Sequence, residues 1–304
     1  MDLAWLWTPP SPLAGLTLAC GWDLPNAASA LCFVGLMLCV AFTVVWGVAW
    51  RMRNAGIVDV FWGISAMLGT GMLMGTGTAH WSVKALIGIP VALAYGRLSL
   101  YLWHRFWQHP QIEDPRYTAF RAISKHPALQ ELAMWGLFLL QAVLMTLFLI
   151  PMALVSQVTP GITTPALLTH IPWLAASLGL WGVGFTLEAL ADAQLAAFRK
   201  SPIPHPDFPS EKPLLTSGVW GWSRHPNYLG QWLMALSYSL IALAFARTDF
   251  DVWLCLLPAV LLYGILTRGT GIAATEAHLA TTRPQAFTAY CKKTAPFFPG
   301  LPWY

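Results

Sequence analysis

Ionisable side chains inside two apolar segments are the first candidates for chemistry. Asp59 lies within the run Ile57–Gly63, and Arg97 lies in a segment that also carries Tyr95 and Tyr101. A charged side chain in hydrocarbon is costly, so such residues usually serve a site or pair with one another. We therefore treat these residues as functional candidates. The alternative is an ion pair between Asp59 and Arg97 that only holds helices together.

Two carboxylates on a third apolar segment also call for a function. Glu188 and Asp192 stand at positions i and i+4, which places them on one face of a helix. Like charges at this spacing repel each other, and the repulsion grows where water is excluded. An arginine, a proton or a ligand hydroxyl must compensate it. The pair therefore belongs either to a binding site or to an ion-pair network that stabilises the bundle.

One loop concentrates polar and aromatic side chains, namely Arg224, His225, Asn227, Tyr228 and Gln231. Pro226 is suited to the first turn of a helix, where its missing N–H costs nothing. Such a helix start offers backbone amides and a positive dipole end, which attract phosphate or carboxylate. Asn227 and Gln231 lie one turn apart on the same face. The simpler alternative makes Arg224 a membrane anchor and Tyr228 an interfacial aromatic.

Two further segments complete the polar set. The loop Arg105–Tyr117 holds Arg105, Arg116 and Tyr117 within a few residues of each other. The tail 273–304 predicts a short helix that folds back over the cytoplasmic mouth, with Glu276 as its carboxylate. The alternative for the tail is an amphipathic segment on the lipid surface.

The composition indicates that lipid surrounds most of the chain. Of 304 residues, 57% are hydrophobic and 10% are charged, against about 25% charged in soluble proteins. The 17 Trp and 15 Phe suit bilayer interfaces. A net charge of +4 does not indicate a nucleic-acid partner. The five cysteines form no C-x-x-C pair, so we expect neither a disulfide framework nor a metal site.

Hydrophobic segments long enough to span a bilayer predict an all-α, seven-transmembrane-helix bundle. We expect spans near 29–50, 56–78, 83–104, 131–155, 171–192, 228–246 and 252–272. Lys and Arg gather in alternate connections, which places the N-terminus outside and the C-terminus in the cytoplasm. The chain then divides into an N-terminal interfacial segment (1–28), the transmembrane domain (29–272) and the cytoplasmic tail (273–304). Gly71-x-x-x-Gly75 predicts close packing of the second span.

Together these motifs resemble the bacterial membrane proteins of the DUF1295 family, which are related to the C-terminal domain of steroid 5-alpha-reductases. The resemblance rests on Glu188–Arg199, Ser217–Tyr228 and the Tyr290–Phe297 tail. It implies a seven-helix membrane enzyme that binds NADPH at the cytoplasmic side and passes hydride to an enone.

Individual positions can be carried over from this resemblance. It implies nucleotide contacts at Asp192, Arg199 and Asn227. It likens Arg97 and Arg105 to two basic positions of the third helix and its loop. It places Asp59 near the carboxylate that holds the substrate carbonyl and Tyr95 near the partner tyrosine.

The sequence also departs from that pattern. Gln231 stands where the family has Glu. Residues 202–209 stand where the reductases have a stretch of the Gly-Tyr-Lys-Ile-Pro type. A steroid substrate is therefore not specifically implied. The run Arg224–Tyr228, with Glu276 and the tail, also resembles isoprenylcysteine carboxyl methyltransferases, which bind S-adenosylmethionine. A third possibility is a non-catalytic lipid-binding protein. The Glu188–Arg199 segment favours the reductase.

We therefore expect an NADPH-dependent reductase in the bacterial inner membrane, with its site facing the cytoplasm. The substrate would be lipophilic, a 3-oxo-4-ene steroid-like compound or another enone, and hydride would reach its beta carbon. Protonated Asp59, together with Tyr95 or Tyr101, would donate a hydrogen bond or a proton to the enolate oxygen that forms. The cofactor site would comprise Arg97, Arg105, Arg116, Tyr117, Glu188, Asp192, Arg199, Arg224, His225, Asn227, Tyr228, Gln231 and Glu276. We expect membrane lipid as the surroundings, and the sequence defines no oligomeric state.

Overall fold

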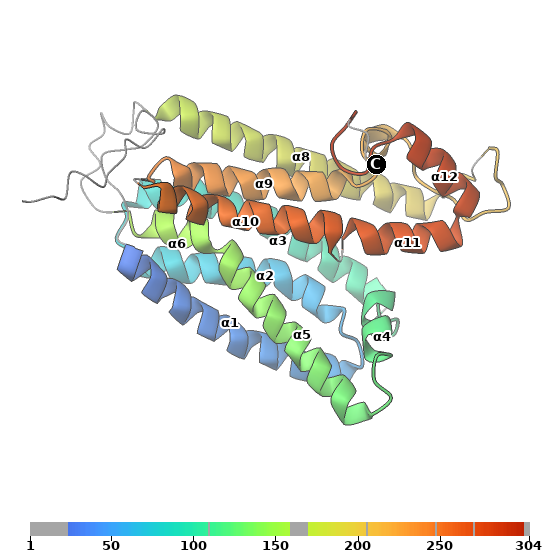
Figure 1. Cartoon of the computed structure of the whole chain (residues 1–304), viewed down its shortest axis with the longest axis horizontal. Helices are drawn as coiled ribbons and strands as arrows, with labels where there is room; N and C mark the ends of the chain where they lie inside the picture. The colour runs from blue at the N-terminus through green and yellow to red at the C-terminus, as the bar shows by residue number, and fades with distance from the viewer. Residues whose placement is uncertain are drawn as a thin grey trace, which may run out of the picture. The chain divides into compact units, whose positions relative to one another are not determined.

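The computed structural model describes residues 24–108, 110–158, 170–204, 206–246, 248–269 and 271–300. The regular elements in these ranges are helices (Figure 1). They fall into two compact units. The first unit is Met1–Ile171 with Ile241–Cys255, and the second is Pro172–Leu240 with Leu256–Tyr304. Most of the expected N-terminal interfacial segment, residues 1–23, lies outside the described residues.

Six helical segments of the described chain are long and apolar enough to cross a membrane. They are Asn26–Met52, Ile57–Thr76, Trp81–Gln108, Pro127–Phe148, Ile171–Lys200 and Asp249–Thr282. The expected span at 228–246 forms helix α9 (Pro226–Leu243), which is not one of the six. Asn227 and Gln231 in its first two turns dilute its apolar character. An all-helical membrane protein is thus confirmed, whereas the seven-helix count and the orientation stay predictions.

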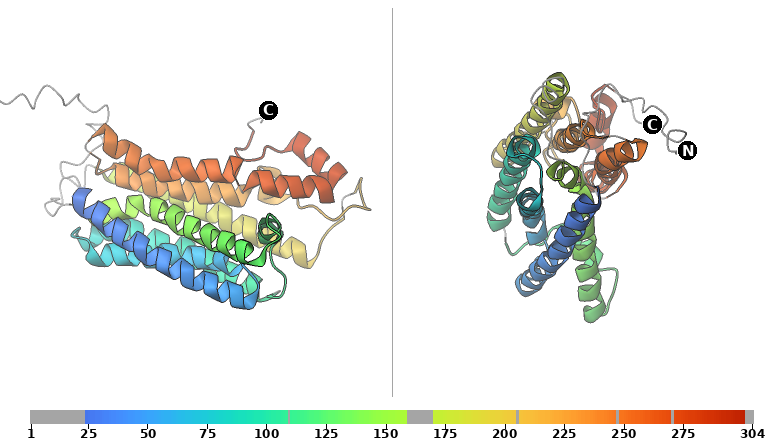
Figure 2. Two further views of the ribbon diagram at one scale, coloured as in Figure 1. Left: turned by 60° about the horizontal axis from the view of Figure 1, so that its bottom comes forward. Right: turned by 90° about the vertical axis from the view of Figure 1, so that its left-hand side faces the viewer.

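The first unit is a group of antiparallel and crossing helices that places α4 beside the start of α2. Its helices are α1 (Leu24–Met52), α2 (Ile57–Thr76), α3 (Trp81–Gln108), α4 (Pro115–Arg121), α5 (Pro127–Phe148) and α6 (Ile150–Ser156). Helix α1 packs against α2 and α5, and α2 packs along α3 (Figure 2).

One expected span is broken in the structure. The segment 131–155 was predicted as a single helix, but α5 ends at Phe148 and α6 begins at Ile150. Pro151 has no N–H to continue the α5 hydrogen-bond ladder, and its ring would clash with the preceding turn. All seven residues of α6 are buried. The prediction of one continuous span here is therefore wrong.

Close packing in α2 occurs at a different glycine from the one predicted. A Cβ added to Gly63 would lie 2.2 Å from Ser99 Oγ and 2.7 Å from the backbone oxygen of Tyr95. At Gly71 and Gly75 a Cβ would meet no atom of the described chain within 4 Å. The prediction of packing through Gly71-x-x-x-Gly75 is therefore wrong, because α2 meets α3 on the face that carries Gly63.

Replacement of Gly63 by alanine should destabilise the first unit. The added methyl group overlaps Ser99 and a backbone oxygen, and overpacking of this kind costs about 1–3 kcal/mol. Gly71→Ala, on the same helix, should be neutral or stabilise slightly because alanine favours helix. Thermal unfolding of the two purified variants in detergent compares them. Equal stability of both variants would contradict this packing.

The second unit carries the polar loop and the tail. Its described elements are α8 (Ile171–Lys200), the 3₁₀ turn η2 (Gly218–Gly221), most of α9 and α10 (Asp249–Arg268), α11 (Ile272–Thr282) and α12 (Pro284–Lys293). Helices α8 and α9 meet at Gly230, where a Cβ would lie 2.6 Å from the backbone oxygen of Gly184. Phe297 of the tail is fully buried in a core with Leu229 and Ile272. The chain after α11 therefore folds back on the start of α9.

Candidate functional site

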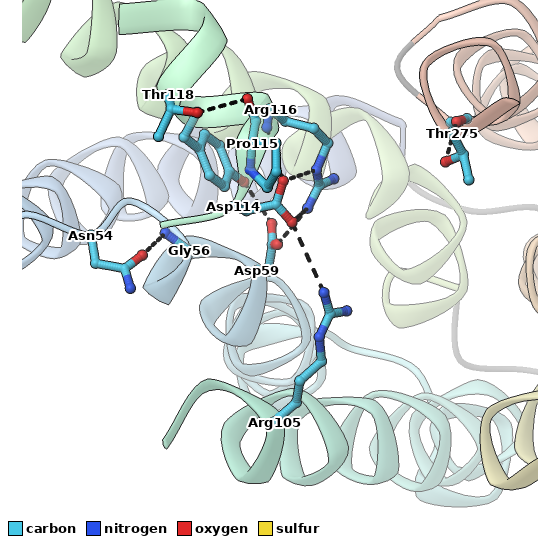
Figure 3. A network of polar contacts seen from close by, with 11 residues as sticks. Asn54, Gly56, Asp59, Arg105, Asp114, Pro115, Arg116, Thr118 and Thr275 are labelled. Carbon is cyan, nitrogen blue, oxygen red and sulfur yellow. Dashed lines mark hydrogen bonds and ion pairs between the residues drawn. The ribbon is translucent and has the colours of Figure 1, made fainter. Parts of the chain in front are cut away.

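The first group of interacting polar side chains joins the starts of α2 and α4 (Figure 3). Tyr117 Oη donates to Asp59 Oδ1 at 2.6 Å, and Arg116 Nη2 donates to Asp59 Oδ2 at 2.8 Å. Arg116 also binds Asp114, through Nε at 3.0 Å and Nη2 at 3.2 Å. We call Asp59, Asp114, Arg116 and Tyr117 the Asp59 cluster. It brings together a carboxylate, a phenol and a guanidinium from segments far apart in the sequence.

A capped helix start presents Arg116 and Tyr117 to Asp59. The side chain of Asp114 accepts a hydrogen bond from the backbone N–H of Arg116 at 3.0 Å and so caps α4. Pro115 occupies the first turn, where its fixed φ favours helix. The side chain of Arg116 then leaves the first turn of α4 toward Asp59 (Figure 3), and Tyr117 reaches the same carboxylate through its hydrogen bond. The dipeptide Asp114-Pro115 is thus the local cause of the cluster.

A turn before α2 holds the connection between α3 and α4 in place. Asn54 is 3% exposed, donates to the backbone oxygen of Pro110 at 2.9 Å and accepts from the N–H of Gly56 at 2.9 Å. The N–H of Ala55 donates to Glu113 Oε1 at 2.8 Å. These bonds fix the segment before α4 against the start of α2. The geometry of the cluster therefore rests on backbone contacts as well as on its own side chains.

The electrostatics of the cluster keep both donors protonated. Burial raises the pKa of the Tyr117 phenol well above its usual value, and the charge of Asp59 adds to this effect. Burial disfavours the charged form of Arg116, but Asp59 and Asp114 outweigh it and raise the pKa of the guanidinium. Both oxygens of Asp59 accept hydrogen bonds from these donors. Asp59 is therefore a hydrogen-bond acceptor in this structure, whereas the sequence suggested it as a proton donor.

The tyrosine bonded to Asp59 is not one of the two predicted partners. Tyr95 and Tyr101 are half-buried on α3, and neither donates to Asp59 in the described part of the chain. Tyr117, which the sequence assigned to the cofactor, makes that bond instead. Because 58 residues separate Tyr117 from Asp59, only the fold reveals the pair.

Two predicted arginines of α3 differ in their surroundings. Arg97 is half-buried within the helix, whereas the Arg105 side chain is 50% exposed. Arg105 Nη2 lies 4.0 Å from Asp114 Oδ2, a separation at which an exposed ion pair contributes little. Arg105 therefore keeps donors for a ligand.

Asp114 should make the stability of the protein depend on acid pH. Burial alone would raise its pKa, but the hydrogen bonds and charge of Arg116 outweigh burial and lower the pKa below the usual 3.8. An acid whose pKa is lower in the folded than in the unfolded protein stabilises the folded state. This stabilisation is complete at pH values above the unfolded-state pKa. It disappears as the pH falls through the folded-state pKa.

Asp114→Asn isolates this charge, because asparagine caps a helix about as well as aspartate. Wild type should be more stable than the variant above about pH 4, and the difference should shrink as the pH falls further. Chemical denaturation in detergent across a pH series measures the two free energies of unfolding. A difference that stays constant down to strongly acid pH would contradict the assignment.

The second group of interacting polar side chains joins the start of α9 to α11. Arg224 Nε and Nη2 bind Glu276 Oε1 and Oε2 at 2.7 and 3.0 Å, and His225 Nε2 lies 3.1 Å from Oε1. Arg224 Nη1 also donates to the backbone oxygen of Thr294 at 2.6 Å. The side chains of Arg224, His225 and Glu276 are 10%, 4% and 20% exposed. We call these three residues the Glu276 cluster.

The tail is bound to the loop by backbone contacts around this cluster. The N–H of Arg224 donates to the backbone oxygen of Ala295 at 2.9 Å, and Ser223 Oγ donates to that of Pro296 at 3.2 Å. Tyr290 Oη donates to the backbone oxygen of Trp220. Burial raises the pKa of Tyr290, so this donor keeps its proton. Ser223 and Tyr290 lie in segments that carry the family resemblance, but the sequence assigned neither of them a role.

The Glu276 cluster limits the hydrogen-bond donors that Arg224 can offer to a ligand. A guanidinium has five N–H donors, and Arg224 directs its Nε, Nη1 and Nη2 groups to Glu276 and Thr294. Its charge is matched by a carboxylate in a bidentate pair. A phosphate contact of Arg224 therefore stays a prediction, and its visible role is to hold α11 and the tail at the start of α9.

Three predicted residues of the second unit have side chains that make no hydrogen bond within the described residues. Asn227 and Gln231 are half-buried on α9, and neither side chain makes a hydrogen bond within the described residues. Arg199 is exposed in the last turn of α8. The ring of Tyr228 stacks on His225, with centroids 5.4 Å apart and planes at 8°. Amide groups, an aromatic face and a guanidinium are the groups that a nucleotide requires.

The two carboxylates of α8 lie in the interior. Glu188 and Asp192 are 4% and 6% exposed. A residue that sequence reasoning missed follows them: Gln194 Oε1 accepts from the N–H of Val219 at 3.1 Å and ties η2 to α8. Gly218 has φ +64°, and Gln194 fills the space where its Cβ would lie. The glycine at position 218, shortly before the Arg224–Tyr228 run, was the sequence signal for this left-handed turn.

Comparison with known proteins gives a family and several local similarities. A family model described as "Protein of unknown function (DUF1295)" matches residues 45–294. Delta(14)-sterol reductase ERG24A of Gibberella zeae is 42% identical over 74 residues, 22% of this chain and 15% of that protein. The Candida albicans enzyme is 41% identical over 76 residues, 23% and 17% of the two chains. A Septoria lycopersici enzyme is 64% identical over 31 residues, 10% and 6% of the chains. The chain thus matches less than a fifth of the length of these relatives.

Proposed function

Because the chain belongs to the DUF1295 family, and because segments of it are similar to Delta(14)-sterol reductases, we propose that it is a membrane-embedded NADPH-dependent reductase. It reduces an activated carbon–carbon double bond in a lipophilic substrate. The observation that carries this proposal is the Asp59 cluster, in which a buried phenol keeps its proton beside a carboxylate and a guanidinium.

Such a cluster is suited to handle the proton that double-bond reduction requires. Tyr117 holds one proton at its hydroxyl oxygen and donates it to Asp59 at 2.6 Å in this structure, so proton transfer to the substrate requires the hydroxyl to exchange Asp59 for the substrate as its acceptor. Arg116 balances the charge of Asp59 through an ion pair at 2.8 Å. We assign Tyr117 as the acid that serves the substrate, with Asp59 and Arg116 as its positioning groups.

The second unit supplies residues that fit the cofactor. The unused amides of Asn227 and Gln231 can bond to the carboxamide and ribose hydroxyls of a nicotinamide nucleotide. The exposed guanidinium of Arg199 can bind phosphate. Bound NADPH would supply a hydride. The side chains of this protein would bind and orient the cofactor. The pair of Arg224 and Glu276 holds the start of α9, which carries Asn227.

The site and its surroundings follow from the same proposal. Lys and Arg gather in alternate connections of the sequence, which favours a site on the cytoplasmic side. The bacterial inner membrane follows only from the resemblance to bacterial members of the family and stays a prediction. The substrate would enter from lipid, and a sterol-like enone or a Delta(14)-sterol is the first choice given the similar proteins.

Ligand-dependent thermal stability tests the cofactor assignment. Purified protein should be stabilised by NADPH, by about 2.7 kcal/mol at a hundredfold excess over the dissociation constant. Asn227→Ala should lose this stabilisation, while Gln285→Ala, which removes an exposed amide of α12, should retain it. Stabilisation by S-adenosylmethionine instead would favour a methyltransferase, and no stabilisation by either ligand would favour a lipid-binding protein.

A further inference from the structure

A carboxylate from the connection between α8 and α9 caps a helix that lies far along the chain. Glu211 Oε1 accepts from the N–H of Gln285 at 2.9 Å, and Oε2 accepts from the N–H of Ala286 at 3.0 Å. These are first-turn amides of α12, which otherwise have no intrahelical partner. A negative charge is stabilising at this helix end. Glu211 therefore acts as the missing N-terminal cap of α12.

The residue at the N-cap position explains why a distant cap is needed. Arg283 occupies that position and makes no capping bond with its side chain. Its Nε instead donates to the backbone oxygen of Pro213 at 2.9 Å. Burial lowers the pKa of Arg283, which marks a partly desolvated cation at this contact. The connection and α12 thus bind each other in both directions, through Glu211 and through Arg283.

The far end of α12 is bound by the same connection. Tyr290 donates to the backbone oxygen of Trp220, and the backbone oxygens of Thr294 and Ala295 accept from Arg224. Helix α12 therefore bridges two points of the segment that leads directly into α9. Loss of the contact at one end would loosen the segment that presents the first turn of α9.

We propose that Glu211 is a positioning residue, which caps α12 and thereby holds the start of α9, with Asn227 and Tyr228, in the geometry that binds NADPH. This role rests on the proposed function of the second unit. It requires no contact of Glu211 with the nucleotide. The charge and both oxygens of Glu211 are needed, because two amides are bonded at once.

Three variants separate this role from a general loss of stability. Glu211→Ala removes the cap, Glu211→Gln leaves one acceptor oxygen for two amides, and Lys212→Ala changes the exposed neighbour. Hydrogen exchange of residues 211–225 and 284–296 is measured first, without nucleotide. NADPH affinity and, with an enone, the separate values of kcat and KM are measured next.

We expect Glu211→Ala to speed exchange at 218–225 as well as at 284–286, and to weaken NADPH binding by roughly tenfold with kcat little changed. Glu211→Gln should be intermediate, which keeps the test valid if the alanine variant does not fold. Exchange that rises only at 284–286, with NADPH affinity equal to that of Lys212→Ala, would overturn the proposal. If wild type binds no NADPH, the proposed function fails, and exchange at 218–225 alone decides whether Glu211 holds this segment.

Discussion

Tyr117→Phe is expected to lower kcat by about 10²- to 10⁴-fold, the usual contribution of a general acid, while NADPH binding is retained. Phenylalanine preserves the ring in its buried position and removes only the hydroxyl that donates to Asp59 at 2.6 Å. The substrate oxygen or carbon would then lack its proton source. Turnover is measured with purified protein, NADPH and an enone in detergent or vesicles.

Tyr101→Phe is the matched control for this variant. Tyr101 is a half-buried tyrosine of α3 that the sequence made a catalytic candidate while it assigned Tyr117 to the cofactor, but Tyr101 makes no bond to Asp59. Its variant should keep wild-type turnover. Loss of activity in Tyr101→Phe together with normal turnover in Tyr117→Phe would refute the assignment of the acid.

The second large effect concerns the Glu276 cluster. Glu276→Gln keeps the size of the side chain but leaves the guanidinium of Arg224 without its countercharge. Breaking a buried pair costs about 3–5 kcal/mol, and we expect about 2–3 kcal/mol here because the two side chains are 10% and 20% exposed. The free energy of unfolding, from denaturation of the purified protein, is the quantity to compare.

His278→Ala provides the control on the same helix. His278 is exposed on α11, two residues from Glu276 and therefore on another face of the helix, and its side chain makes no hydrogen bond in the described part of the chain. The control should have wild-type stability. If Glu276→Gln were as stable as His278→Ala, the Arg224–Glu276 pair would have no structural role, and both residues could again be assigned to phosphate or ribose.

Helices were the most predictable part of this fold, because lipid leaves a buried chain little alternative to helical hydrogen bonding. The sequence predicted α9 to begin at Pro226, which the structure confirms. It missed the break after Phe148, although Pro151 was a visible signal, since hydropathy alone does not register a missing N–H. The count of spans depends on α9, whose polar first turns make its hydropathy ambiguous.

Contacts between helices were not predictable, because residues on different helices are related only by packing. Gly63, Gly71 and Gly75 all look alike in the sequence, yet only Gly63 faces a neighbouring helix closely among these three. Apart from Asp114, the sequence selected the polar residues of both clusters one at a time, but it could not pair them. Tyr117 with Asp59 and Arg224 with Glu276 are separated by 58 and 52 residues.

The most direct test of the account is product analysis with isotope-labelled cofactor. Purified wild-type protein is incubated in vesicles with deuterium-labelled NADPH and either a lipophilic enone or a Delta(14)-sterol, and the product is examined by mass spectrometry. We predict a product with the double bond saturated and one deuterium from the cofactor, formed by wild type and nearly absent with Tyr117→Phe. An unchanged double bond with every substrate, together with transfer of a methyl group from S-adenosylmethionine, would contradict the account.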